Sequence, residues 1–334
     1  MSAGLEVQLG ALRLANPVLV AAGTFGYGVE FRRAVRLDQL GAIVTKTLTL
    51  QPRHGNPPPR LVDTPSGMLN AVGLHNVGLE VFLEQKLPDL EPWHVPVIVS
   101  IWAESLQEMA AMVKRLDAEP RVDAIELNLS CPNLKPGARR EAQGPRPVDL
   151  EPWSLNLGAG MVAQDAEATA AMVQAARAQT TKPLLAKLSP DVTDIRPIAQ
   201  AAERAGADAV TLVNTFTGMS LDPHSRRSRL GSLTGGLSGP AIRPLAVWRV
   251  WQVRQAVRCP IVGAGGIARA EDAVEFFLAG ATAVAVGTAT FSHPAAALRV
   301  LKGLRRYLAR HRLDAIQRLI GTLQDGAAPT QTRA

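Results

Sequence analysis

The segment ELNLSCPN, from Glu126 to Asn133, gathers side chains well suited to chemistry. It continues an apolar run, and the two-residue period of a strand places Glu126 and Asn128 on one face. Cys131 can exchange a proton or attack an electrophile, although a free thiol of pKa ~8.5 is mostly protonated at neutral pH. The amides of Asn128 and Asn133 offer paired donors and acceptors, which suit an imide-like heterocycle. The segment therefore indicates a reactive cysteine beside a polar ligand.

Lys46 and Lys187 each end an apolar run. A cation at such a position can stabilise an anionic ligand, such as a reduced flavin ring or a carboxylate, or it can form a Schiff base. The alternative is a structural ion pair inside the fold, for which Glu126 is an available partner. We expect both lysines to serve a ligand.

Two glycine-rich turns follow late apolar runs, GAGGI from Gly263 to Ile267 and VGTAT from Val286 to Thr290. Such glycines let backbone N–H groups approach a ligand, and a following helix N-terminus favours phosphate. Tight turns without a ligand are the alternative. The GAGG string does not open a βαβ unit with a downstream acid, so it is not a dinucleotide fingerprint. The two turns together predict a phosphate-bearing ligand.

Further asparagines follow other apolar runs. Asn70 lies in GMLNAVGLHN, and Asn214, with Thr215 beside it, lies in TLVNTFTG. Single asparagines after strands are usually turn formers or caps. Four amides at one rim, Asn70, Asn128, Asn133 and Asn214, favour a polar ligand cage instead. The six histidines lack a metal-ligand spacing, so we expect no metal site.

Eight short apolar runs that alternate with helical patterns must position these residues. The expected strands are Pro17–Ala22, Ala42–Lys46, Val97–Ile101, Ala124–Leu129, Leu184–Leu188, Ala209–Val213, Ile261–Gly265 and Ala283–Val286. The expected helices include Leu106–Leu116, Ala166–Ala178, Ile195–Ala205, Ala241–Val257, Glu271–Leu278 and Ala295–Leu308. Apolar strands alternating with helices indicate an α/β fold with a parallel sheet, and eight units predict a (β/α)8 TIM barrel, with a doubly wound sheet as the weaker alternative.

The remaining segments complete the predicted barrel. The opening LEVQLGALRL predicts an N-terminal hairpin at the barrel's bottom. Thr47–Asn76 and Pro132–Gln164 are too long for simple connections and follow strand ends, so both are candidate substrate loops at the C-terminal face. We expect one domain over residues 1–320, with an active-site loop inserted at about 134–160, and a tail at 321–334.

Composition narrows the class of protein. The chain has 334 residues, a formal net charge of +7 and two cysteines. Cys131 and Cys259 cannot supply the thiolates of an iron–sulfur cluster or a disulfide framework, and Cys259 is expected to be a core residue. Glu6 occupies the position of a signal-peptide core and no long apolar run follows, which predicts a cytoplasmic protein without a membrane span. The arginines are scattered, so we expect no nucleic-acid partner.

Together these motifs resemble the dihydroorotate dehydrogenases, and among them the class 1 flavoproteins. The similar stretches are NPVLVAAGTFGYG, TKTLTLQPRHGNPPPRL, SGMLNAVGLHN, DAIELNLSCPN, KLSPDVTDI, GADAVTLVNT, GGLSGPAIRP, PIVGAGGI and AVAVGTA. SCPNLKPG is most similar to class 1B, the catalytic subunit that works with a separate FAD and [2Fe–2S] subunit to reduce NAD⁺. The resemblance implies oxidation of (S)-dihydroorotate to orotate in de novo UMP biosynthesis. It also implies one FMN per chain, and a homodimer core of a heterotetramer whose partner subunit alone holds FAD and the cluster.

The resemblance assigns roles to individual residues. Cys131 would remove the C5 proton of dihydroorotate while hydride passes from C6 to FMN, and Lys46 would lie between flavin and substrate. The implied FMN-binding residues are Ala22, Lys46, Thr47, Ser100, Asn128, Lys187, Val213, Gly239, Gly265, Gly266, Gly287 and Thr288. The implied substrate-binding residues are Lys46, Asn70, Ala71, Val72, Gly73, Leu74, Asn128, Asn133, Asn214 and Thr215.

Two features depart from the class 1B pattern. Ser100 stands where asparagine is common, which puts a flavin contact there in question. The additional stretch KPGARREAQGPRPVDLEPWSL follows Asn133, and we expect it to reshape the lid over Cys131. The alternatives are a class 1A enzyme using fumarate, another FMN barrel reductase (dihydropyrimidine dehydrogenase-like, or a dihydrouridine synthase) and a Schiff-base aldolase using Lys187.

Overall fold

Eight parallel strands form the centre of the computed structural model, which describes residues 4–130 and 162–324. Each strand pairs with its neighbours along the chain, and β16 closes the barrel onto β3. The strands are β3 (Val18–Val20), β4 (Ala42–Val44), β7 (Val97–Ile101), β8 (Ala124–Asn128), β9 (Leu184–Lys187), β10 (Ala209–Leu212), β15 (Ile261–Ala264) and β16 (Ala283–Val286). The predicted (β/α)8 TIM barrel is confirmed, and several strands end a residue or two earlier than expected.

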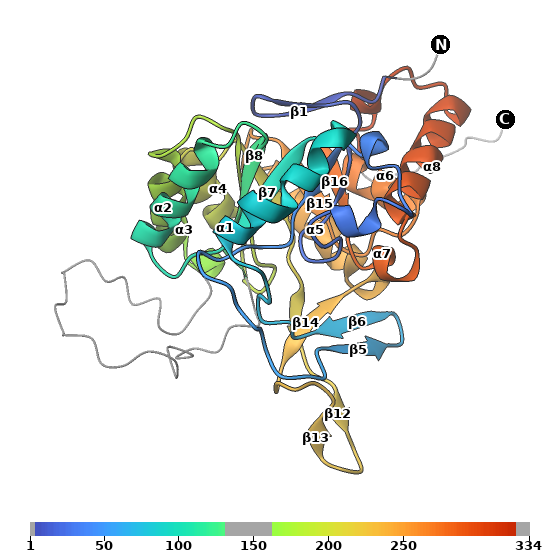
Figure 1. The fold of residues 1–334 in the computed structure, drawn as a ribbon. Coiled ribbons are helices and arrows are strands. Elements are labelled where there is room, and N and C mark those ends of the chain that lie inside the picture. The colour runs from blue at the N-terminus through green and yellow to red at the C-terminus, as the bar shows by residue number, and fades with distance from the viewer. Residues whose placement is uncertain (1–3, 131–161, 325–334) are drawn as a thin grey trace.

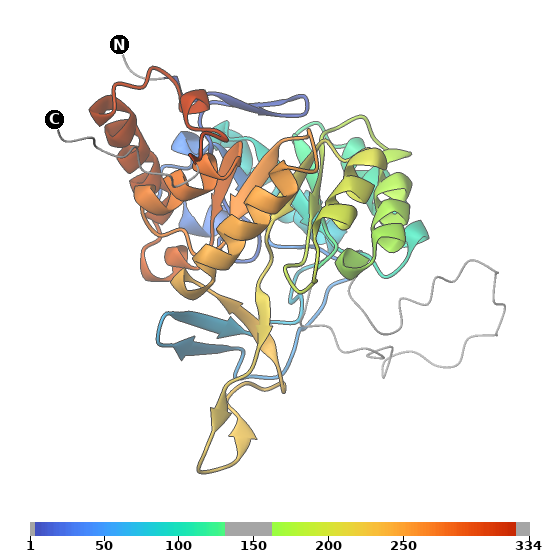
Figure 2. The same cartoon turned by 180° about the vertical axis from the view of Figure 1, so that it is seen from behind.

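Helices cover the outside of the barrel (Figures 1 and 2). Side-chain caps fix the start of two of them, because the Ser105 hydroxyl accepts the N–H of Glu108 and the Asp165 carboxylate accepts that of Ala168. The helices are α1 (Leu79–Val81), α2 (Leu106–Asp117), α3 (Ala166–Arg177), α4 (Arg196–Arg204), α5 (Arg243–Arg254), α6 (Ala270–Leu278), α7 (Ala289–Ser292) and α8 (Ala296–Arg310). All six helices that the sequence predicted are confirmed.

The N-terminal hairpin is also confirmed. Strands β1 (Val7–Leu9) and β2 (Leu12–Leu14) pair antiparallel, with alternating buried and exposed residues. Gly10 makes the turn at φ +58°, and a Cβ there would lie 2.6 Å from the Cβ of Asp208, just before β10 begins. The hairpin therefore packs against the amino ends of the barrel strands.

A four-stranded antiparallel sheet lies at the opposite end of the barrel, over the carboxyl ends of the strands (Figure 1). Its order is β11 (Phe216–Gly218), β14 (Gly235–Ser238), β6 (Gly67–Asn70) and β5 (Leu61–Thr64). A small hairpin, β12 (Leu221–Asp222) and β13 (Arg227–Ser228), extends from this sheet away from the barrel in both views (Figures 1 and 2).

The sequence analysis missed this sheet and treated 47–76 as an irregular loop. Its strands are three or four residues long and lack a clear buried alternation, so no local period marks them. β6 pairs with β14, and the Asn70 amide reaches Gly236, 166 residues further along the chain. A separate small apolar cluster of Val62, Leu69, Ala71 and Leu230 supports the sheet.

Buried apolar side chains form one large cluster in and around the barrel. Within the described ranges, no helix is both long and apolar enough to cross a bilayer.

Candidate active site

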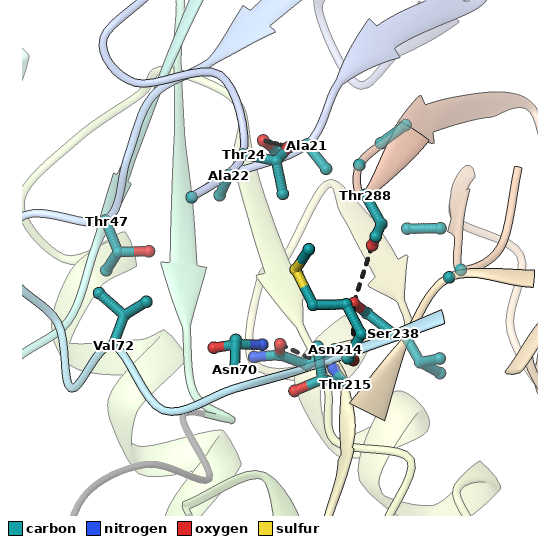
Figure 3. Close-up of a pocket in the computed structure, with 18 of the residues that line it drawn as sticks. Ala21, Ala22, Thr24, Thr47, Asn70, Val72, Asn214, Thr215, Ser238 and Thr288 are labelled. Atoms are coloured by element: carbon teal, nitrogen blue, oxygen red, sulfur yellow. Dashed lines mark hydrogen bonds between the residues drawn. The ribbon is translucent and has the colours of Figure 1, made fainter. Parts of the chain in front are cut away.

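A cavity opens where the carboxyl ends of the barrel strands meet the four-stranded sheet (Figure 3). Barrel strands supply its floor and one wall, while β5, β6 and β14 supply the opposite wall. The predicted site residues that line it are Ala22, Lys46, Thr47, Asn70, Val72, Gly73, Leu74, Asn128, Lys187, Val213, Asn214, Thr215, Gly239, Gly265, Gly266, Gly287 and Thr288. Segments far apart in the sequence therefore meet at one site. This site lies at the C-terminal face of the barrel, where the predicted order of strands and helices placed it.

Glycines build one end of the cavity, which we call the glycine end: Gly239, Gly265, Gly266 and Gly287. Three of them have left-handed backbones, with φ of +90° at Gly239, +133° at Gly265 and +72° at Gly266. A Cβ on Gly266 would lie 2.8 Å from the Gly239 oxygen and from the Arg243 Cβ. Only glycine fits such a position without strain, and the bare backbone leaves room for a ligand.

A buried carboxylate supports the glycine end from behind. Asp272, at the start of α6, accepts the backbone N–H groups of Ala268 and Arg269 at 2.9 Å each. Its second oxygen pairs with the guanidinium of Arg243, which begins α5. The loop after Gly266 is therefore held between two helices. Sequence reasoning missed this support, because Arg243 lies in the stretch GGLSGPAIRP but was given no role, and Asp272 belongs to none of the similar stretches.

Amide side chains build the other end of the cavity, the amide end, formed by Asn70, Asn128, Asn214 and their partners. The Asn214 amide nitrogen donates to the Ser130 oxygen at 2.8 Å and to the Asn128 oxygen at 3.3 Å. Asn128 donates to the Thr47 hydroxyl at 3.0 Å, and Asn70 donates to the Gly236 oxygen at 3.2 Å. These contacts fix the amides relative to one another. Three of the four predicted cage asparagines therefore line one cavity, and they also hold parts of its wall.

The two predicted lysines both line the cavity. Lys187 is only 6% exposed and lies in register between Asn128 on β8 and Thr211 on β10. Glu126 hydrogen-bonds Thr211 at 3.0 Å and forms no salt bridge with Lys187, so the ion pair considered as an alternative is absent here. Burial, and then the nearby Arg60 guanidinium, hold the pKa of Lys46 below its ordinary value, while the Glu30 carboxylate opposes this. Both cations are thus available to an anionic ligand.

A glycine cradle, two lysines and an amide network at one barrel mouth match the pattern expected from the motifs. The family model described as "Dihydroorotate dehydrogenase" matches residues 4–147 and 155–308. The chain belongs to the dihydroorotate dehydrogenase family. Membership decides against the aldolase and dihydrouridine synthase alternatives.

Three similar proteins are each named "Dihydroorotate dehydrogenase B (NAD(+)), catalytic subunit". The protein of Trichlorobacter lovleyi is 48% identical over 325 residues, which cover 97% of this chain and all of the relative. That of Geotalea daltonii is 47% identical, over 96% of this chain and 98% of the relative. That of Pelobacter propionicus is 46% identical, over 97% of this chain and 100% of the relative. The resemblance to the class 1B catalytic subunits is confirmed.

Two residues implied by the dihydroorotate dehydrogenase resemblance lie outside the cavity wall. Ser100 is fully buried behind Thr47, with the two hydroxyls 3.0 Å apart. It can influence a ligand through Thr47 rather than by contact. Ala71 is also buried, and it packs with Val62 and Leu69 beneath the sheet.

Cys131 and Asn133, with the inserted loop at about 134–160, lie outside the described residues. Ser130 ends the described segment and is tied to Asn214, so the chain leaves the barrel at the amide end. The other cysteine behaves as predicted. Cys259 packs against the main core just before β15, and burial together with the Glu203 carboxylate raises the pKa of its thiol to about 12.

Several lining residues were missed by sequence reasoning: Ala21, Gly23, Thr24, Leu61, Met68, Ser238, Ile242, Ala264, Ala285 and Phe291. Ala21 and Thr24 come from the turn after β3, so their place after a strand could have found them (Figure 3). Ser238 accepts a hydrogen bond from Thr288 at 2.8 Å and belongs to the unpredicted sheet (Figure 3). Of the lining residues on that sheet, Asn70 was predicted, but no local period marks the strands that carry Leu61, Met68 and Ser238.

Proposed function

We propose that this chain is the catalytic subunit of an NAD⁺-linked dihydroorotate dehydrogenase, which oxidises (S)-dihydroorotate to orotate in pyrimidine biosynthesis. Relatives with that name, 46–48% identical over nearly the whole chain, support the assignment. The observation that carries it is the cavity itself, which joins the glycine end, Lys46, Lys187 and the amide end at one barrel mouth.

The residues of the glycine end fit the phosphate of FMN. Bare backbone at Gly265 and Gly266 occupies positions that a Cβ would fill, and the following helix α6 adds a favourable dipole. Lys187 is a buried cation that lines the cavity, and it would stabilise negative charge on the bound flavin. When bound, FMN supplies the acceptor for the hydride that leaves C6 of dihydroorotate. The proposed contacts are Ala22, Lys46, Thr47, Asn128, Lys187, Val213, Gly239, Gly265, Gly266, Gly287 and Thr288.

The amide end suits the pyrimidine ring of the substrate. Asn128 and Asn214 present amide groups whose donors and acceptors complement the imide edge. Lys46 offers a partly buried cation to the carboxylate of dihydroorotate, which would raise the depressed pKa of the lysine. Residues 70–74, Asn133 and Thr215 complete the proposed substrate contacts.

Cys131 is the proposed general base that takes the C5 proton. It directly follows Ser130, whose hydroxyl and carbonyl both accept hydrogen bonds from Asn214. The base would therefore start from an anchored point beside the substrate amides. The additional loop after Asn133 would form part of the lid, and unchanged substrate affinity and turnover after deletion of residues 139–153 would contradict that role.

The electron route requires a partner. Two cysteines are too few for a [2Fe–2S] cluster, so this cluster and FAD would belong to a separate subunit. We infer a homodimer of the catalytic chain at the core of a heterotetramer. In this arrangement residues 1–320 would form one FMN-binding barrel, followed by the tail.

The decisive test is anaerobic flavin reduction. Purified protein should contain FMN, and its visible absorbance should bleach when dihydroorotate is added. Cys131→Ser should slow bleaching by about 100-fold or more at neutral pH, because a serine hydroxyl is a far poorer base. Cys259→Ser is the matched control, since this thiol lies at the other end of the barrel, and its rate should equal the wild-type rate. FMN-loaded protein that stays oxidised with dihydroorotate would overturn the function, and a wild-type rate for Cys131→Ser would remove only the base.

A further inference from the structure

Glu126 carries an acidic group inside the barrel that the proposed reaction does not use. Its side chain is 2% exposed, and one carboxylate oxygen accepts a hydrogen bond from Thr211 at 3.0 Å. The other oxygen is buried and has no hydrogen-bond partner among the described residues. An isolated buried carboxylate is costly, so its retention at this point calls for a compensating charge.

The strand register shows where Lys187, the candidate for that compensating charge, lies relative to Glu126. Asn128 on β8, Lys187 on β9 and Thr211 on β10 lie side by side in one layer of the barrel interior. Glu126 lies one layer deeper on β8, opposite Leu185 on β9. Because its carboxylate reaches Thr211, two strands away, the side chain crosses the inner face of β9 beneath Lys187.

Few other charges face this carboxylate. Strands β7 and β10 carry no ionisable side chain, and the remaining charge on an adjacent strand is Lys187 of β9. Lys46 lies above at the cavity, where Glu30 and Arg60 are its own charged neighbours. In the described ranges the other buried ionisable side chains are Asp272, which lies on α6 outside the barrel, and Tyr27, whose hydroxyl accepts the N–H of Val77.

We propose that Glu126 is a positioning residue, the buried counter-charge that keeps the Lys187 side chain directed at the cavity. Thr211 holds the carboxylate one layer below, so the two groups attract without the close pairing that would draw Lys187 away from a ligand. The role deepens the proposed function, because the ligand that Lys187 would meet there is the flavin ring. The arrangement keeps the cation fixed when negative charge develops above it.

The first test is the FMN midpoint potential at pH 6.5. Glu126→Gln keeps the size and the hydrogen-bonding oxygen but removes the charge, so the potential should rise, because the reduced flavin loses a nearby negative charge. Thr211→Ser is the matched control, because it keeps both charges and the hydroxyl that holds the carboxylate, and it should leave the potential unchanged. A Glu126→Gln potential equal to that of the wild type would overturn the proposal.

A second test uses the apoprotein, so it stands even if the flavin assignment fails. Glu126→Gln and Lys187→Met should each lower the urea midpoint, because each leaves one buried charge uncompensated. The double variant should recover most of the loss, and it should be recoverable in soluble form even if a single variant is not. Losses that simply add, or a double variant no more stable than the worse single variant, would show that the two charges are not coupled.

Discussion

The two ends of the cavity are built by different means. The glycine end is backbone, with left-handed φ angles at Gly239, Gly265 and Gly266, and a carboxylate supports it from behind. The amide end is made of side chains on strand ends that hydrogen-bond one another, Asn128 to Thr47 and Asn214 to Ser130. A left-handed glycine that packs closely admits no added atom, whereas a side-chain site can lose a contact while the fold survives. Substitutions at the glycine end should therefore lower the stability of the fold, whereas substitutions at the amide end should slow the reaction with substrate.

The largest effect is expected at Gly266. In Gly266→Ala the new Cβ meets Arg243 and the Gly239 oxygen at 2.8 Å, at a φ of +72°. We expect the free energy of unfolding to fall by about 1–3 kcal/mol and bound FMN to be lost. Chemical denaturation and the flavin absorbance of purified protein measure both.

Gly287→Ala provides the matched control at the same end. Its φ is not left-handed, and the nearest atom to a new Cβ is the Ala21 Cβ at 3.5 Å. The free energy of unfolding should stay within about 0.5 kcal/mol of wild type. Equal destabilisation by both alanines would show that backbone conformation does not distinguish these glycines.

A substitution at the amide end should impair chemistry instead of folding. Asn214→Ala removes the donor to Ser130 and Asn128 and the acceptor for the Thr215 N–H. Reduction by dihydroorotate should slow about 10- to 100-fold, equivalent to about 1.4–2.8 kcal/mol, while FMN content is retained. Stopped-flow absorbance under anaerobic conditions measures this rate.

Asn16→Ala separates the loss of a ligand contact from the loss of a structural amide. Asn16 bonds Gln39 and Val18 at the start of β3, far from the cavity. It should lower stability but leave the reduction rate of the folded protein unchanged. If Asn16→Ala slowed reduction as much as Asn214→Ala, the slow reduction in Asn214→Ala could not be attributed to a lost substrate contact at the amide end.

The same contrast explains what could be read from the sequence. The barrel strands are recognisable in the sequence as apolar runs. Residues at or just after the ends of these strands, such as Lys46, Asn128 and Asn214, were therefore correctly predicted to lie at the barrel mouth. The sheet that forms the facing wall was not found, because its pairing between β6 and β14 joins distant segments without a local period. Met68 and Ser238 were missed with it.

Support residues were equally hard to read. Asp272 and Arg243 lie on separate helices and meet only through packing. The family resemblance implied a flavin contact for Ser100, which the serine itself put in question, and the neighbouring Thr47 side chain separates it from the cavity. Sequence order gives the strand that carries a residue, and the packed neighbours decide whether it reaches the ligand.

Weakening the support of the glycine end should produce a smaller and more selective loss. Asp272→Asn keeps an oxygen for the Ala268 and Arg269 N–H groups but removes the charge facing Arg243. The Kd for FMN should rise about 5- to 10-fold, in line with a loss of about 1–1.4 kcal/mol, with little change in the reduction rate once loaded. Fluorescence titration of apoprotein with FMN measures the Kd.

Glu275→Gln is the control for the charge around Arg243. Glu275 is 45% exposed and lies 3.4 Å from the guanidinium, so its loss should change the Kd less than about twofold. A Kd equally insensitive to Asp272→Asn would mean that the loop keeps its shape without the buried pair.

The smallest effect on stability is expected from replacing Lys46 in the apoprotein. This lysine should matter for substrate binding while contributing nothing to folding at neutral pH. Burial and Arg60 hold its folded-state pKa below the unfolded value, so the unfolded chain binds more protons between those two values. Lys46 therefore lowers the free energy of unfolding at pH values below its folded-state pKa. This penalty disappears as the pH rises from the folded-state pKa to the unfolded-state pKa. Lys46→Met should slightly raise the thermal midpoint of apoprotein at pH 7, flatten its rise at alkaline pH and still abolish tight binding of dihydroorotate. A thermal midpoint that falls at pH 7 would mean that Lys46 stabilises the fold through contacts of its own. Substitutions on the substrate side of the cavity would then reduce stability as those at the glycine end do, only by a smaller amount.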